Sequence, residues 1–209
     1  MESSTNDKRY TYSLYGLKNI IFDPEISDTQ NLLLFQGATA LCETVKNIDE
    51  LGRINKKIIS ADYGPLITNL ANQAAMASRL LFDNNKKGPR ETDFSYGLRK
   101  ERIAYVESFL KAQKIKIRLL KNTQFRNQVF HIDEYLSDRL GKREHEGWFI
   151  DMVIPEENTF SNNCVSIKFC RTYISKEHKL KHLDIELDLS VLREECRTIL
   201  GVVFGIAVS

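Results

Sequence analysis

The chain has 209 residues, of which 42% are hydrophobic and 28% are charged, a composition typical of one globular domain. These values exclude a disordered chain, a collagen-like chain and a chain made of membrane spans. Basic residues exceed acidic ones by only two, which excludes a protein that binds nucleic acid over its whole surface. Any site for a polyanion must therefore be local.

The sequence gives no sign of secretion or of a membrane anchor. The four cysteines, Cys42, Cys164, Cys170 and Cys196, are scattered without a Cys-x-x-Cys pair, which is typical of a reduced protein. The polar N-terminus lacks the apolar run of a secretory signal, and the longest apolar stretch, residues 202–208, is far shorter than the ~20 residues of a membrane helix. We therefore expect a cytoplasmic protein with no membrane partner.

Three helices are predicted in the first half of the chain, after a polar start whose first 13 residues we expect to be frayed. Ser27 or Asp28 can cap a helix over residues 28–56. Its apolar positions follow the three-and-four spacing of one buried helix face: Leu34, Ala38, Leu41, Val45 and Ile48. The same spacing predicts a second helix over residues 67–82 and a third over about 97–113.

The second half combines one more helix with a small β-ribbon. Residues 114–120 alternate like a strand, but the helical patterns on both sides favour helix, and a fourth helix is predicted from near Leu119 through Leu140. A polar hairpin connection is predicted over residues 175–182, and a last helix opens at Ser190. The predicted strands cover residues 148–154, 165–174 and 183–187.

The predicted fold is mainly α. Residues 1–147 form a helical bundle, and residues 148–209 add the β-ribbon and a closing helix that packs back on the bundle as part of the same domain.

Most signatures of common enzymes are missing, including the phosphate-binding loop, the nucleophile elbow, the His-Glu-x-x-His motif and the glycine fingerprint for dinucleotides. Two cysteines precede two histidines, at Cys164, Cys170, His178 and His182, but their spacing misses the zinc pattern at its first two intervals. We interpret these residues as buried strand cysteines and a solvated hairpin turn. No metal and no cofactor are predicted.

The most informative string is Arg-Asn-Gln-Val-Phe-His at residues 126–131, inside the predicted fourth helix. An Arg, a polar residue directly after it and a His five positions on resemble the Arg-polar-x-x-x-His motif of the HEPN superfamily, all-α domains found in many prokaryotic ribonucleases, toxins and phage-defence proteins. Residues 72–82 and the continuation through Glu134 also look like a group of uncharacterised bacterial HEPN-like proteins. The resemblance covers about residues 28–141 and implies a HEPN-like four-helix bundle.

The resemblance implies catalytic roles for Arg126, Asn127 and His131. In the family, two copies of the motif face one another across a dimer, so each chain of a homodimer would supply these residues to a composite site at the interface. At about 100° per residue, Asn127 and His131 share a helix face, whereas Arg126 diverges from His131 by about 140° and must reach around with its long side chain.

These residue types suit cleavage of RNA without a metal ion. An RNA 2′-hydroxyl can attack its adjacent phosphate if one group removes its proton, another protonates the departing 5′-oxygen, and a cation stabilises the added charge. His131 can give or take a proton near neutral pH. Arg126 offers a permanent forked charge for phosphate oxygens, and Asn127 can orient the imidazole or bind a phosphate oxygen.

Basic residues just before the motif are candidate substrate contacts. Six positive charges and no acid fall between residues 111 and 126. We assign substrate binding to Lys114, Lys116, Arg118 and Lys121. The alternative is a solvated helix face balanced by acids of other helices, and salt separates the two because phosphate contacts weaken steeply with ionic strength.

The motif has structural alternatives as well. Arg126 can pair with Asp133, Glu134 or an acid on another helix, and His131 can be a core imidazole bonded to a carbonyl. We expect a metal-independent endoribonuclease that acts on RNA as a toxin or phage-defence effector, which implies an antitoxin or defence-system partner. The other hypotheses are a catalytically silent HEPN-like module that binds RNA, a nucleotide or a protein, and a purely structural helical dimer.

Overall fold

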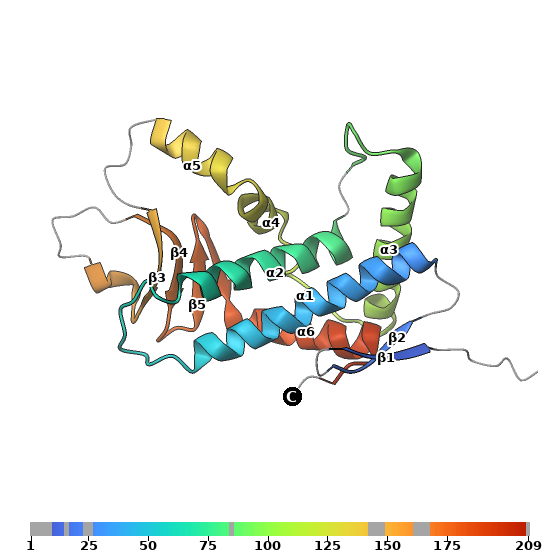
Figure 1. Cartoon of the computed structure of the whole chain (residues 1–209), viewed down its shortest axis with the longest axis horizontal. Coiled ribbons are helices and arrows are strands. Elements are labelled where there is room, and N and C mark those ends of the chain that lie inside the picture. Colours follow the sequence, from blue (N-terminus) through green and yellow to red (C-terminus); the bar gives the residue numbers. More distant parts are fainter. Residues whose placement is uncertain are drawn as a thin grey trace, which may run out of the picture.

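The computed structural model describes residues 10–14, 17–22, 27–83, 86–141, 149–160 and 168–207. The fold is mainly helical, with a small four-stranded sheet and a closing C-terminal helix (Figure 1). The helices are α1 (Asp28–Gly52), α2 (Gly64–Phe82), α3 (Asp93–Ala112), α4 (Thr123–Phe130), α5 (Ile132–Gly141) and α6 (Leu189–Phe204), with a short 3-10 helix η1 (Glu157–Phe160). The strands are β1 (Tyr10–Leu14), β2 (Leu17–Phe22), β3 (Phe149–Ile154), β4 (Lys168–Ile174), β5 (Lys179–His182) and β6 (Ile185–Asp188).

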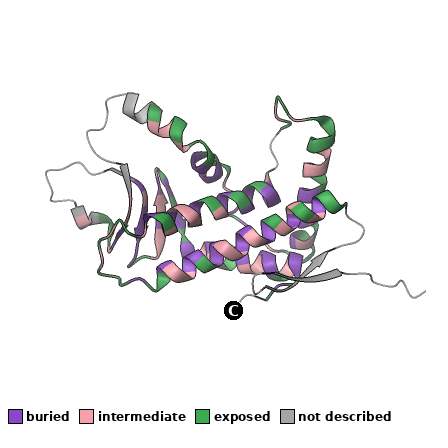
Figure 2. Cartoon of the chain, viewed as in Figure 1, coloured by how far each residue is buried: buried purple, intermediate pink, exposed green. Residues whose placement is uncertain are grey.

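The core lies between α1, α2 and α6. Helices α1 and α2 run side by side and α6 packs against α1, with their buried faces turned toward one another (Figure 2). A Cβ at Gly37 would come within 2.6 Å of Leu81 Cδ2, so any larger residue at this position of α1 would force the buried Leu81 side chain of α2 to shift. Small side chains at Ala71, Ala74 and Ala75 serve the same contact from α2.

The sheet packs at one end of the α1–α2 pair, and α3 stands at the other end (Figure 1). Its strand order is β3-β4-β5-β6, with β3 parallel to β4 and the other pairs antiparallel. Ser60, in the loop between α1 and α2, forms a bridge with Val153 of β3 and so ties the helical pair to the sheet. Helix α4 lies against α2 between these two ends, which places the motif beside the core.

The three long helices predicted in the first half and the closing helix are confirmed, with ends shifted by a few residues. Within the described residues, no helix combines the length and the apolar character needed to cross a membrane.

Two predictions about strands were wrong. Of the 13 residues expected to be frayed, residues 1–9 lie outside the described residues, but residues 10–13 belong to strand β1, which pairs with β2 as an antiparallel hairpin. Residues 179–182 are strand β5 rather than part of a polar connection. In β5, Leu180 and His182 are buried and alternate with the less buried Lys179 and Lys181. The sequence therefore contains the alternation of a strand, but the lysines make it look polar.

Two predictions about helices were also wrong. Residues 115–118 have no regular structure, because Lys114 at φ 56° ends α3 and the backbone N–H groups of residues 118–120 bind a side chain of α6, described below. The predicted fourth helix is two helices that break at His131, where the chain has φ −119° and ψ 35°. The break moves the histidine from the interior of a helix to its end.

Candidate functional site

Arg126 lies in the first turn of α4 and is buried. The side chain of Asn122 caps this helix by accepting a hydrogen bond from the Phe125 N–H. Arg126 is only 3% exposed, and its Nη1 lies 3.3 Å from Oδ1 of Asp83, the residue that follows α2. The sequence allows two roles for Arg126, a phosphate ligand or a partner for an acid of another element. In the structure, the side chain forms an ion pair with such an acid. This pair attaches the start of α4 to the end of α2.

His131 and Asn127 lie at the exposed end of α4. The His131 N–H donates to the Asn127 carbonyl at 2.9 Å, so the two residues stand one turn apart. The imidazole is 55% exposed, and its Nδ1 lies 3.3 Å from Oε1 of Glu134. His131 is therefore not a core imidazole. The carboxylate of Glu134 can orient the ring by accepting from Nδ1, which leaves Nε2 able to take a proton.

The structure brings together only part of the predicted catalytic set. Asn127 and His131 share one exposed surface, whereas Arg126 is turned toward α2 on the buried side of α4. No hydrogen bond or ion pair joins Arg126 to His131 in this part of the chain. Within a single chain, the two side chains therefore lie on different sides of α4, one buried and one exposed.

The predicted substrate-binding residues are exposed on the loop that joins α3 to α4. Lys114, Lys116 and Arg118 form no ion pair with a described residue. Lys121 does: its Nζ lies 2.5 Å from Oε1 of Glu107 and 5.4 Å from the centre of the Phe82 ring. Three of the four charges are thus available to a polyanion, and the fourth is partly balanced.

Glu195 of α6 holds this loop in place, and sequence reasoning missed it. Its carboxylate is 8% exposed and accepts hydrogen bonds of 2.7–3.0 Å from three successive backbone N–H groups, those of residues 118, 119 and 120. The signal was an acid on the apolar stripe of α6, between Leu192 and Ile199. A buried carboxylate requires hydrogen-bond donors, and this loop supplies them.

The two cysteines and two histidines that were compared with the zinc pattern form no metal site in the described part of the chain. Cys164 lies outside the described residues, and no three His, Cys, Asp or Glu side chains of the rest form a group that could hold a metal. Nδ1 of His178 is 2.8 Å from the Tyr173 hydroxyl. The prediction of a solvated turn was wrong for His182, which is fully buried on β5.

His182 is an unusual core residue. Neither ring nitrogen makes a hydrogen bond of normal geometry to a described residue, and the ring packs edge-on against Phe125 of α4. Burial, followed by repulsion from Arg171, lowers the pKa of His182 to about 4. The folded chain therefore holds this imidazole neutral through the range in which an unfolded histidine becomes protonated.

We expect His182 to make the fold sensitive to acid. The unfolded chain takes up this proton near pH 6.5 and the folded chain only near pH 4, so stability falls as pH drops through this window. Between pH 7 and pH 5 the free energy of unfolding should fall by about 2 kcal/mol more in the wild type than in His182→Gln. Urea unfolding of both proteins at the two pH values measures this difference, and equal pH dependence in both would contradict it.

Comparison of the chain with family models, with curated proteins and with solved structures finds no match.

Proposed function

We propose that this chain is a metal-independent endoribonuclease of HEPN type. The observation that carries the proposal is the exposed imidazole of His131, which stands at a helix end with Glu134 on one side and Asn127 one turn before it. A solvent-accessible histidine that is oriented by a carboxylate can act as a general acid or a general base. The basic loop before α4 supplies positive charge for the RNA backbone.

In the proposed reaction, His131 takes the proton of an RNA 2′-hydroxyl or gives one to the departing 5′-oxygen. The 2′-oxygen forms a bond to phosphorus as the bond to the 5′-oxygen breaks, which leaves a 2′,3′-cyclic phosphate on one product. Among the described residues, His131 is the one histidine placed in this way, and a homodimer with two copies of it can supply both the acid and the base. Asn127 lies within one turn and binds a phosphate oxygen or orients the ring.

The burial of Arg126 changes the role that we propose for it. Its charge is balanced by Asp83 and its side chain is covered, so we assign it the task of positioning α4. The exposed cations Lys114, Lys116 and Arg118 then meet the charge of the phosphodiester.

The test is incubation of the purified protein with RNA in the presence of EDTA. We expect chelator-resistant cleavage with 2′,3′-cyclic phosphate ends, and a rate at least about 100-fold lower in His131→Gln. Gln124→Ala, an exposed change on the same helix, is the matched control and should cleave like the wild type. Equal cleavage by the wild type and His131→Gln would refute the proposal.

The ion pair between Arg126 and Asp83 favours a second candidate, a catalytically silent module that binds RNA or a nucleotide. Because of this pair, the guanidinium of the motif is buried and does not reach the exposed surface, while the basic loop stays accessible. RNA binding that weakens with salt, without any cleavage by the wild type, would support this candidate over the first.

A further inference from the structure

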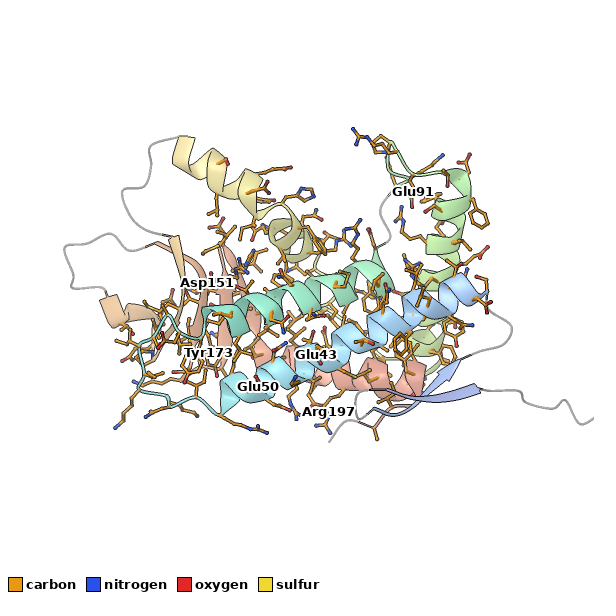
Figure 3. The ribbon with its side chains drawn as sticks, viewed as in Figure 1. Glu43, Glu50, Glu91, Asp151, Tyr173 and Arg197 are labelled. Atoms are coloured by element: carbon orange, nitrogen blue, oxygen red, sulfur yellow. The ribbon has the colours of Figure 1, made fainter. Side chains whose placement is uncertain are left out.

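A pocket of about 730 Å³ lies where the start of α1, the end of α2 and the start of α3 meet. Its volume falls within the range of sites that hold small molecules, about 300–1,000 Å³. Glu91, labelled in Figure 3, marks this end of the molecule, which is opposite the sheet. The pocket is separate from the exposed surface of His131 but shares Asp83 with the buried side of α4.

The lining of the pocket is rich in cations, and its two acids are already engaged. Arg99 binds Glu91 with both ends of its guanidinium, Nε to Oε1 at 3.0 Å and Nη2 to Oε2 at 2.8 Å. These hydrogen bonds lower the pKa of Glu91 to about 2, so it stays ionised and bound. Asp83 faces Arg126 at 3.3 Å and Arg99 at 3.7 Å. Among the described residues, the pocket-lining cations Arg79, Lys86 and Arg102 form no ion pair.

Arg102 is the most informative of these cations because it is 5% exposed. Its Nε donates to the Leu80 carbonyl at 2.7 Å, and its two terminal amino groups make no hydrogen bond to a described residue. Burial, and then the charge of Arg99, lower its pKa from the ordinary arginine value. Asp83 is near enough for its charge to act on Arg102, but it forms no ion pair with it. A buried cation without an ion-paired carboxylate is costly to the fold, and an anion in the pocket would reduce that cost.

The mouth of the pocket adds an aromatic surface. Phe94, in the first turn of α3, lines the pocket and is 76% exposed, which is unusual for so large an apolar side chain. Leu33 and Leu98 line the wall as well. Arg79 is exposed, with its guanidinium 5.3 Å from the centre of the Phe130 ring, so it is fixed at the α4 side of the pocket. A planar base can stack on a ring placed in this way.

We propose that this pocket binds a nucleotide, with its phosphate on Arg102 and Arg79 and its base against Phe94. A free nucleotide and the 5′-phosphorylated end of an RNA share this chemistry. The proposal does not depend on cleavage by His131, since none of these three residues contacts that histidine.

The experiment is calorimetric titration of the full chain with AMP, adenosine and inorganic phosphate. Two further probes are tetranucleotides with 2′-O-methyl groups, one with a 5′-phosphate and one with a 5′-hydroxyl, which cannot be cut through a 2′-hydroxyl. The variants are Arg79→Gln and Phe94→Ser, both at exposed side chains. Arg53→Gln is the matched control, because Arg53 is an exposed arginine at the far end of α1.

We expect AMP to bind at least tenfold more tightly than adenosine, and Arg79→Gln to remove most of that difference. Phe94→Ser should weaken AMP and adenosine alike and leave the affinity for inorganic phosphate unchanged. Arg53→Gln should bind like the wild type. Tighter binding of the 5′-phosphorylated tetranucleotide than of AMP would identify an RNA end as the ligand, and equal affinity would identify the free nucleotide.

The proposal is overturned if none of the probes binds, if AMP binds no better than adenosine, or if Phe94→Ser leaves AMP affinity intact. It is also overturned if Arg53→Gln weakens AMP as much as Arg79→Gln does. Arg102→Gln should abolish binding of inorganic phosphate if the variant folds, and the two exposed variants decide the question if it does not. None of these outcomes involves RNA cleavage, so they separate this proposal from that of a ribonuclease.

Discussion

Replacing Glu195 by alanine is expected to lower the free energy of unfolding by about 4 kcal/mol or more. The change leaves three backbone N–H groups of the loop between α3 and α4 without their acceptor, and a hydrogen bond to a charged group contributes about 1.5–3 kcal/mol. Urea unfolding followed by circular dichroism measures the loss. Glu195→Gln keeps one accepting oxygen but turns an amide group toward N–H donors, so an intermediate loss is expected.

The neighbouring acid provides a matched control for this prediction. Glu194 is 67% exposed and lies 3.6 Å from Arg197 and 3.7 Å from Arg193 in surface ion pairs. Such pairs contribute about 0–1 kcal/mol, so Glu194→Ala should remain close to the wild type. Hydrogen exchange at residues 118–120 should quicken in Glu195→Ala only. Similar losses of stability in the two variants would show that the loop does not depend on this carboxylate.

The second large effect is expected for Arg126→Met, which should lower the free energy of unfolding by about 3 kcal/mol. The change keeps most of the side-chain volume but removes the ion pair that Arg126 forms with Asp83. The measurement is urea unfolding of Arg126→Met, Asp83→Asn and the double variant. The double variant should lose less than the sum of the single changes, because the two residues contact each other.

The same variant distinguishes the two roles of Arg126. At a temperature where Arg126→Met is folded, a positioning role predicts a cleavage rate within about tenfold of the wild type. A loss of about 100-fold or more in the folded variant would instead mean that the guanidinium meets the phosphate, as the motif implies. The cleavage rate of His131→Gln on the same RNA shows how large the loss is when a catalytic residue is removed.

The sequence predicted the elements that have strong periodicity. The stripe from Leu34 to Ile48 and the alanine-rich face of α2 each specify a buried helix face without any knowledge of their neighbours. The parts that failed depend on distant partners. Residues 115–118 have helical patterns on both sides, but a carboxylate about 75 residues further along the chain takes the N–H groups that a helix would use. No local pattern contains that information.

The motif residues can be named from the sequence, but the arrangement of their side chains cannot. Spacing placed Asn127 and His131 together, and they do share an exposed surface. The ion pair of Arg126 with Asp83 joins residues 43 positions apart, and the sequence offered several acids for it. The sequence does not predict the arginine-lined pocket, because its arginines are spread over α2 and α3 and come together only when those helices pack. An acid within an apolar stripe, such as Glu195, is the signal that could have been read.

The position of Glu195 also bears on how the protein is made. Ribosomes deliver a chain from its N-terminus, so the basic loop and α4 emerge well before α6. Until α6 has left the exit tunnel, the loop lacks the carboxylate that gathers its backbone, and its N–H groups are bound to water. In a nascent chain, which is surrounded by ribosomal and messenger RNA, this surface therefore stays unassembled until α6 has emerged.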